Sequence, residues 1–395
     1  MRLAQEQPLV RGCPVCGRDG GEVLHHQRFA VFDGYPLPDA YDVAACPECG
    51  MVFAETPATQ PDYDRYYSEW SIYASGSVAS EFERERQRGV AQRLASDASR
   101  ILDIGCGSGL LLELLREGGH ASITGLDPSP SCVATVRAKG IAAYQGWFSA
   151  LPSELATYDL VILNSVLEHL LDVRAAIAAV IRVLAPGGRL FISVPDAARY
   201  ADHLHAPFHD FSTEHINHFS PESLDALLVQ FGMHRVAFDR LSVRGPGGLP
   251  IPIFEATYER GEGLRGAVYD MRRAMRRYIE LSAAWMARLN ARIESALEPS
   301  PDLIVWGTGQ LAMKLARETA LAKAPIIAWV DGNPVHHGRK LRGAPVLAPD
   351  KIDTPTAAVL ITTLLHTAAI EKRIRSLGWN NEVMRLEGTS TPCPS

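Results

Sequence analysis

The fold of this chain is decided by the stretch Ile101-Leu102-Asp103-Ile104-Gly105-Cys106-Gly107-Ser108-Gly109-Leu110-Leu111-Leu112. Its first four residues predict a buried strand, its glycines a loop, and its leucines the start of a helix. This order of strand, glycine loop and helix is typical of the ligand-binding crevice of a doubly wound sheet. We therefore expect an α/β fold that binds a small molecule at the carboxyl end of this strand.

Two more strands follow in the order that such a sheet requires. Residues 122–127 predict a strand that ends in Asp127, about twenty residues beyond the loop, where an acid can bind both hydroxyls of a ribose. Residues 158–164 predict a third strand that ends in Asn164. The three strand ends would meet at one edge of the sheet, because parallel strands share their carboxyl edge.

This series, with the turn Pro186-Gly187-Gly188 before a strand at 190–194, resembles the class I S-adenosylmethionine-dependent methyltransferases over residues 99–236. A loop that reads Gly-x-Gly-x-Gly disfavours NAD binding, which is the competing interpretation. The resemblance implies a Rossmann-like sheet with S-adenosylmethionine as cofactor. The cofactor-binding residues that it implies are Asp103, Gly105 and Gly107 at the methionine part, Asp127 at the ribose and Asn164 beneath the sulfonium.

Aromatic residues offer two further candidates for the same site. Many relatives carry an acid after the residue that corresponds to Gly146, whereas this chain has Trp147 and Phe148. Trp147 could stack on the adenine, although a tryptophan of the core fits equally well. Residues 63–73 contain five aromatic side chains, which suit either a lid over a polar small molecule or a segment packed between domains.

Four of the seven cysteines form two Cys-Pro-x-Cys-Gly knuckles, with Cys13 and Cys16 in the first and Cys46 and Cys49 in the second. Two residues between paired thiols let a tight turn aim both sulfurs at one ion, so the knuckles predict a tetrahedral zinc site with four cysteine ligands. Because cysteine fills all four positions, no place remains for water or substrate, and we expect a structural zinc.

Five of the thirteen histidines lie between His203 and His218, just after the predicted strand at 190–194. In open α/β sheets, ligands bind at the carboxyl edge, and a segment that directly follows a strand leaves the sheet at this edge. Four interpretations compete, namely a solvated loop, structural histidines, a second metal site, and acid–base chemistry by Glu214 and His215; the apolar residues of the segment disfavour the solvated loop. The pair is a candidate for acid–base chemistry because imidazole titrates near neutral pH.

The order of strand, glycine loop and helix occurs a second time. Residues 303–306 predict the strand, Gly307-Thr308-Gly309 the loop, and a further strand ends at Asp331. This pattern predicts a C-terminal Rossmann-like domain. Apolar residues spaced three or four apart predict a helix over 264–297. The expected domains are a zinc-binding module (1–60), a methyltransferase domain (61–245), a helical connector (246–298) and the Rossmann-like domain (299–395).

The zinc-binding module, the methyltransferase domain and the C-terminal Rossmann-like domain together resemble the sugar C-methyltransferases, which methylate nucleotide-linked 4-keto-6-deoxyhexoses at C3. The family segment reads Tyr-His-Glu-His and, three residues later, Tyr-Phe-Ser. Here Glu214, His215, Phe219 and Ser220 match, whereas Ser212, Thr213 and His218 depart from it. The resemblance implies that His215 removes the C3 proton with the assistance of Glu214, and that a nucleotide sugar is the substrate.

Composition and charge limit the classes of partner and the cellular location that we expect. The 395 residues carry a net charge of −6, which argues against nucleic-acid and anionic-membrane partners. The sequence offers neither an 18-residue apolar run nor a basic-then-apolar start, so we expect a cytoplasmic enzyme. O- or N-methylation of another small polar metabolite, a zinc-scaffolded nucleic-acid-binding protein, and a regulator that binds the cofactor without turnover remain alternatives. The oligomeric state is not predicted.

Overall fold

The structure, a computed structural model, describes residues 11–70, 80–94, 99–148, 151–153, 155–245, 248–262, 270–298, 302–352 and 357–386. The chain divides into two compact units. Unit 1 comprises Met1–Leu24, Asp42–His203 and Glu214–Met275, and unit 2 comprises His25–Tyr41, Leu204–Thr213 and Arg276–Ser395. Each unit is therefore assembled from segments that are distant in the sequence.

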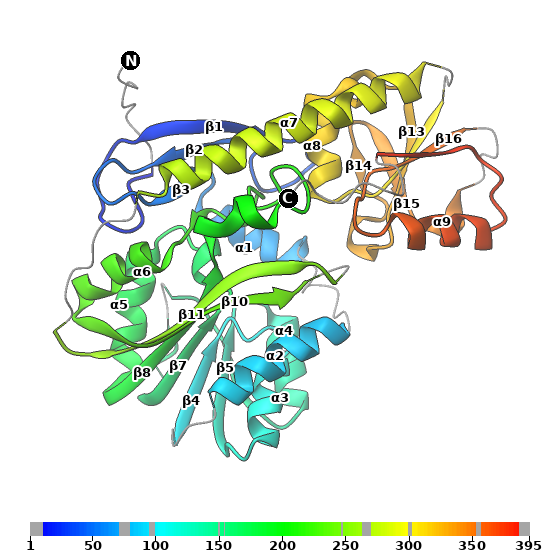
Figure 1. Cartoon of the computed structure of the whole chain (residues 1–395). Coiled ribbons are helices and arrows are strands. Elements are labelled where there is room, and N and C mark those ends of the chain that lie inside the picture. Colours follow the sequence, from blue (N-terminus) through cyan, green and yellow to red (C-terminus); the bar gives the residue numbers. More distant parts are fainter. Residues whose placement is uncertain are drawn as a thin grey trace. The chain divides into compact units, whose positions relative to one another are not determined.

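Unit 1 is built on a seven-stranded sheet (Figure 1). Its strands are β4 (Arg100–Ile104), β5 (Ser122–Asp127), β6 (Ala142–Gln145), β7 (Tyr158–Asn164), β8 (Leu184–Pro195), β10 (Met233–Arg244) and β11 (Pro250–Arg260). Their order is β10-β11-β8-β7-β4-β5-β6. The five strands β4 to β8 are parallel, β11 runs antiparallel to β8, and β10 runs antiparallel to β11. The expected α/β fold with a Rossmann-like sheet is confirmed.

Helices cover both faces of this sheet (Figure 1). One face carries α5 (Val173–Val183) and α6 (Pro221–Leu228), and the other carries α2 (Glu81–Arg93), α3 (Leu110–Glu117) and α4 (Pro130–Ala138). Side chains of a strand alternate between its two faces. In β7, Val161 and Leu163 accordingly join the core with α5 and α6, whereas Leu160 and Ile162 join the core with α2–α4. Burial on both faces explains the uninterrupted apolar run Leu160–Leu163 within the strand.

The structure differs from the expected helical connector at 246–298. Residues 250–260 form β11, which lies between β8 and β10 in the methyltransferase sheet, and the connector's helix is α7 (Arg272–Leu297). Phe254, Ala256 and Tyr258 of β11 are buried in the core that also contains residues of α5 and α6. Its partner β8 is distant in the sequence, so no local sequence pattern predicted this pairing.

A four-stranded sheet, ordered β1-β2-β3-β9, carries the cysteine knuckles. Its strands are β1 (Glu22–Arg28), β2 (Ala40–Ala45), β3 (Val52–Glu55) and β9 (Asn217–His218). Antiparallel pairing joins β3 to β9, with Val52 opposite His218 and Phe53 opposite Asn217. The helix α1 (Gln60–Glu69) follows β3, and Thr59 and Asp62 cap its first turn.

Unit 2 contains a six-stranded sheet in the order β14-β15-β13-β12-β16-β17. Its elements are β12 (Leu303–Trp306), α8 (Gln310–Glu318), β13 (Ile326–Val330), β14 (Lys340–Leu341), β15 (Ala344–Leu347), β16 (Ala358–Ile361), α9 (Thr367–Ser376) and β17 (Val383–Arg385). The predicted strand, glycine loop and helix are present, and Thr308 N donates to Asp331 Oδ2 at 2.8 Å. Across the residues placed by the structure, no helix is long and apolar enough to cross a membrane.

Candidate functional site

The glycine loop between β4 and α3 has a backbone that other residues would strain. Gly105 and Gly107 have φ angles of 77° and 52°, in the left-handed region. A Cβ at Gly105 would lie 2.7 Å from Val166 Cγ2, closer than real carbon contacts come. The predicted role of both glycines, which is to let a ligand approach the backbone, fits this geometry.

Asp127, at the end of β5, holds the loop from the side. Its Oδ2 accepts from Gly107 N at 2.8 Å, and its Oδ1 accepts from Ser129 N at 2.9 Å. Burial raises the pKa of this carboxyl, and the two backbone donors oppose that rise. Each carboxylate oxygen retains acceptor capacity for a hydroxyl, as ribose binding requires.

Asp103 lies in the neighbouring strand β4, next to its last residue, and is almost completely buried. Burial, together with the charge of Asp127, raises the pKa of Asp103 to about 8. Within the described residues, Asp103 Oδ1 has no hydrogen-bond partner. An orphaned acid beside a glycine loop suits a ligand that brings a positive charge and hydroxyls, so the residues present fit S-adenosylmethionine.

Asn164 ends β7 at the same edge of the sheet and is held by helix α2. Its Nδ2 donates to Gln87 Oε1 at 2.8 Å, and Arg86 donates to the hydroxyl of Ser165. Ser165 has a φ of 59°, a strained value of the kind that gathers at functional sites. Sequence reasoning missed Arg86 and Gln87 because α2 carries no motif that links it to β7.

The segment that carries Glu214 and His215 is fixed to the short helix η2 (Leu167–His169), which follows β7. Ile216 N donates to the carbonyl of Glu168 at 2.8 Å. Asn217 Nδ2 donates to the carbonyls of Leu167 and Leu170, each at 2.7 Å. These bonds bring the ring of His215 to 4.8 Å from the ring of His169, with an angle of 80° between them.

Helix α1 brings aromatic side chains to the same place. The ring of Tyr67 lies 6.2 Å from that of His169 and 6.0 Å from that of Trp147. The hydroxyl of Tyr66 hydrogen-bonds the carboxylate of Glu214, and burial raises the pKa of that carboxyl. The predicted aromatic segment thus connects the adenine candidate Trp147 with the Glu214–His215 pair. Residues 71–73 of the segment lie outside the described residues.

Glu168 and His169 were not singled out from the sequence, although they stand shortly after a strand that ends at the ligand-binding edge. Glu168 is 1% exposed, and burial raises its pKa to about 8, opposed by the charge of Arg86. Burial lowers the pKa of His169 to about 4. The distance between Glu168 Oε1 and His169 Nε2 is 3.9 Å. Position at the edge of the sheet was the signal that could have found them.

We do not assign the other histidines of the 203–218 segment to the candidate site. His218 lies in β9, packs against Tyr200 and is completely buried, which lowers its pKa to about 3. His203 Nε2 lies 2.9 Å from Arg199 Nη2. His205 and His209 belong to unit 2. In unit 1, His215 is therefore the member of the segment that faces the candidate site.

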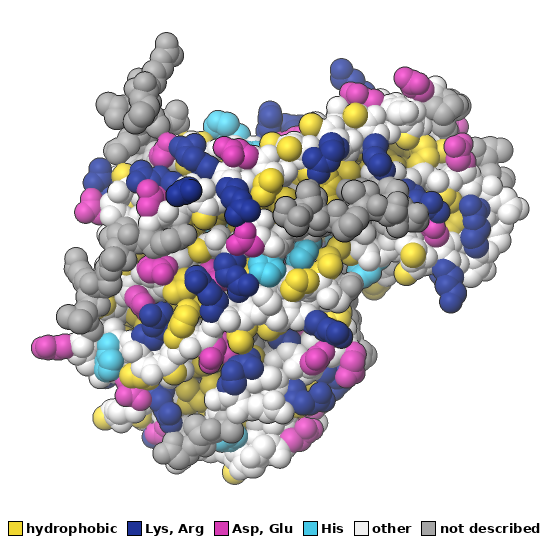
Figure 2. Space-filling view, viewed as in Figure 1, with side chains coloured by type: hydrophobic (Ala, Val, Ile, Leu, Met, Phe, Trp, Pro, Cys, Tyr) yellow, Lys and Arg dark blue, Asp and Glu magenta, His cyan; other side chains and the backbone are white. Residues whose placement is uncertain are grey.

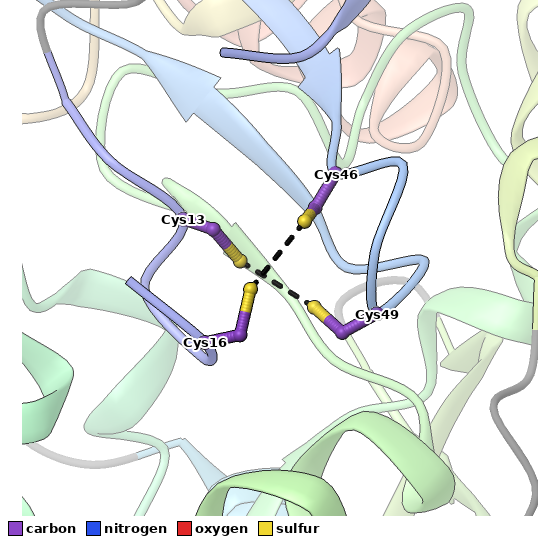
Figure 3. A group of neighbouring side chains, drawn as sticks. All are labelled: Cys13, Cys16, Cys46 and Cys49. Carbon is purple, nitrogen blue, oxygen red and sulfur yellow. Dashed lines mark hydrogen bonds between the residues drawn. The ribbon is translucent and has the colours of Figure 1, made fainter. Parts of the chain in front are cut away.

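The four cysteines converge as the sequence predicts (Figure 3). Cys13 Sγ is 3.5 Å from Cys49 Sγ, and Cys16 Sγ is 3.5 Å from Cys46 Sγ. A tetrahedral zinc with Zn–S bonds of about 2.3 Å requires sulfurs about 3.8 Å apart. Each knuckle closes on a glycine with positive φ, at Gly17 and Gly50. The four sulfurs therefore fit a zinc ion with no position left open.

Comparison with known proteins finds similarity in the central part of the chain. Residues 78–236 match a family described as a methyltransferase domain. The ubiquinone biosynthesis O-methyltransferase of Xylella fastidiosa is 34% identical over 112 residues, which are 26% of this chain and 45% of that protein. A probable S-adenosylmethionine-dependent methyltransferase of Mycolicibacterium smegmatis is 32% identical over 136 residues, which are 33% of this chain and 52% of that protein.

Among solved structures, the N-methyltransferase NodS from Bradyrhizobium japonicum is 20% identical, with a TM-score of 0.36 over 46% of this chain and 89% of that chain. The chain spans about half the length of the curated relatives that it matches. The family match covers the methyltransferase domain and includes neither the cysteine knuckles nor the Rossmann-like sheet of unit 2.

Proposed function

We propose that this chain, whose residues 78–236 are a methyltransferase domain, transfers the methyl group of S-adenosylmethionine to carbon in a nucleotide-linked keto-deoxysugar. One observation carries the proposal. The imidazole of His215 lies beside His169, and the carboxylate of the preceding residue, Glu214, accepts from Tyr66, in the same unit as the glycine loop. Methyl transfer to carbon needs such a group, because a carbon nucleophile must first lose a proton.

Bound S-adenosylmethionine would supply an electrophilic methyl group. Asp127 would accept from its ribose hydroxyls, Gly105 and Gly107 would lie against its methionine part, and Asp103 would face the charged end. Trp147 would cover the adenine, and Asn164 would lie beneath the sulfonium. These assignments follow from the resemblance, and the contacts of the loop and strand ends support them.

His215 would take the proton from the carbon next to the ketone, which leaves an enolate. A ketone acidifies the adjacent C–H, and a positioned base typically contributes roughly 10²–10⁴-fold. Glu214, held by Tyr66, would orient the imidazole and stabilise its protonated form. The rigid connection of this segment to η2 supports the proposal, since in-line transfer depends on positioning.

We further propose that the four cysteines bind one structural zinc ion. The pairing of β3 with β9 connects the zinc-binding sheet to the segment that bears the catalytic pair. The ion would therefore stabilise the position of His215, although it would take no part in the chemistry.

A second candidate function is methylation of oxygen in another small polar metabolite. It is favoured by the names of the relatives, of which the Xylella fastidiosa protein is an O-methyltransferase. A nucleic-acid substrate is disfavoured, because basic and acidic side chains are interspersed over the visible face and the net charge is −6 (Figure 2).

Solvent exchange tests the role of His215. Wild-type protein, with the demethylated cofactor and a nucleotide-linked 4-keto-6-deoxyhexose in D₂O, should introduce deuterium at the carbon next to the ketone, as followed by NMR. His215→Asn should slow exchange roughly 10²–10⁴-fold. His120→Asn, which removes a half-exposed imidazole outside the site, should exchange at the wild-type rate. Equal exchange in His215→Asn would remove this residue from the role of base.

A further inference from the structure

We propose that Glu168, His169 and His215 form a second metal site, which binds a divalent transition-metal ion. One ligand atom from each of these three side chains lies within 4.8 Å of the other two. The group is separate from the four cysteines and brings together two adjacent residues of η2 and one residue of the segment that follows Thr213.

The chemistry of the three donors selects the kind of ion. Two imidazoles and one carboxylate suit zinc, cobalt, nickel and ferrous ions, whereas magnesium and calcium prefer oxygen donors alone. Three protein ligands leave one or more coordination positions for water or a substrate oxygen. By contrast, the four-cysteine cluster leaves no coordination position open, because its cysteines would supply all four ligands.

Two buried donor atoms point to a ligand here. Glu168 is 1% exposed, yet its Oε2 has no hydrogen-bond partner among the residues that the structure describes. The same holds for His169 Nδ1. Leaving such an atom buried and unsatisfied is unfavourable, and coordination of an ion through it would remove that cost.

The backbone already places the three residues for coordination. The bond from Ile216 N to the carbonyl of Glu168 links the residue after His215 directly to the first ligand. Metal–ligand bonds of about 2.0–2.2 Å bring neighbouring ligand atoms to about 3.0–3.6 Å. Coordination therefore requires the ligand atoms of these three side chains to move closer together than the 4.8 Å within which they now lie.

A bound ion would compete with catalysis. Coordination uses the imidazole lone pair with which His215 would accept a proton, so the ion should inhibit the enzyme. This consequence rests on the proposed function, whereas binding of the ion does not. The two are therefore measured separately.

Binding is tested on zinc-loaded protein by titration with Co²⁺, followed by visible absorption and by metal content after gel filtration. Wild-type protein should bind one Co²⁺ per chain beyond the zinc. Glu168→Gln and His169→Asn should each weaken that binding roughly tenfold or more while the zinc content stays unchanged. His26→Asn, which removes an exposed histidine, should bind Co²⁺ like the wild type.

Two outcomes would overturn the site. One is wild-type protein that binds no ion beyond the zinc, and the other is Co²⁺ binding that survives in both Glu168→Gln and His169→Asn. The inhibition is tested with the deuterium exchange above. Stoichiometric Co²⁺ should abolish exchange, and a chelator too weak to remove the cysteine-bound zinc should restore it. Exchange that continues with the second ion bound would overturn the competition while leaving the metal site in place.

Discussion

At the scale of single residues, Asp127 combines two tasks. Its carboxylate fixes the glycine loop through Gly107 N and the next turn through Ser129 N, and it offers the remaining lone pairs to a ligand. An amide has one acceptor oxygen, so an asparagine would turn an NH₂ group toward one of these donors. The loop and the ligand therefore depend on the same charge.

We expect Asp127→Asn to weaken S-adenosylmethionine binding about 10–100-fold, because a hydrogen bond to a charged group contributes about 1.5–3 kcal/mol. Isothermal titration calorimetry measures the affinity. Asp159→Asn is the matched control, since Asp159 accepts from Arg100 N at the start of β7, outside the cofactor-binding edge. An affinity that stays unchanged in Asp127→Asn would contradict the assignment.

At the scale of elements, β9 connects parts of unit 1 that are far apart in the sequence. It has two residues, which pair with β3 of the cysteine-bearing sheet, while Asn217 also bonds the carbonyls around η2. Arg11, two residues before the first zinc-ligand candidate, donates to the carbonyl of Ile216 and to Asn217 Oδ1. Strand β3 of the cysteine-bearing sheet and Arg11 thus hold the segment that carries His215.

Replacement of Cys46 by serine should therefore have two effects. Zinc content should fall from one ion per chain toward none, and the midpoint of thermal unfolding should fall by about 6–12 °C for a loss of about 3 kcal/mol. Deuterium exchange should also slow in the protein that remains folded, because β9 loses its support. Cys132→Ser changes a buried thiol outside the cluster and should retain the zinc. Full exchange without zinc would contradict the bracing role.

The sequence predicted those parts of this site that are encoded by one short, continuous stretch of residues. The glycine loop, Asp127 and Asn164 each stand directly at the end of a predicted strand, and the structure has β4, β5 and β7 there. Each cysteine knuckle is likewise a short motif whose spacing alone orients its two thiols. By contrast, the proximity of His169 and His215, the pairing of β3 with β9, and the place of β11 depend on contacts between distant segments. No periodicity or motif encodes such contacts.

At the scale of the whole molecule, the identity of the methylated atom separates the two candidate functions. The family match covers residues 78–236 and is to a methyltransferase domain, which leaves the acceptor atom open. The narrower proposal depends on the Glu214–His215 pair and on two parts outside that match, which are the cysteine knuckles and the Rossmann-like sheet of unit 2. Methylation of carbon and methylation of oxygen make different demands on that pair, because an oxygen nucleophile already has a lone pair.

The most direct test uses S-adenosylmethionine labelled with ¹³C at the methyl group. The full-length, zinc-loaded protein is incubated with nucleotide-linked 4-keto-6-deoxyhexoses, and the product is examined by mass spectrometry and ¹³C NMR. We predict that the product gains one methyl group, and that the carbon of this group shows one-bond coupling to a carbon of the sugar ring when the sugar is also labelled. A labelled methyl group attached to oxygen or nitrogen would contradict it.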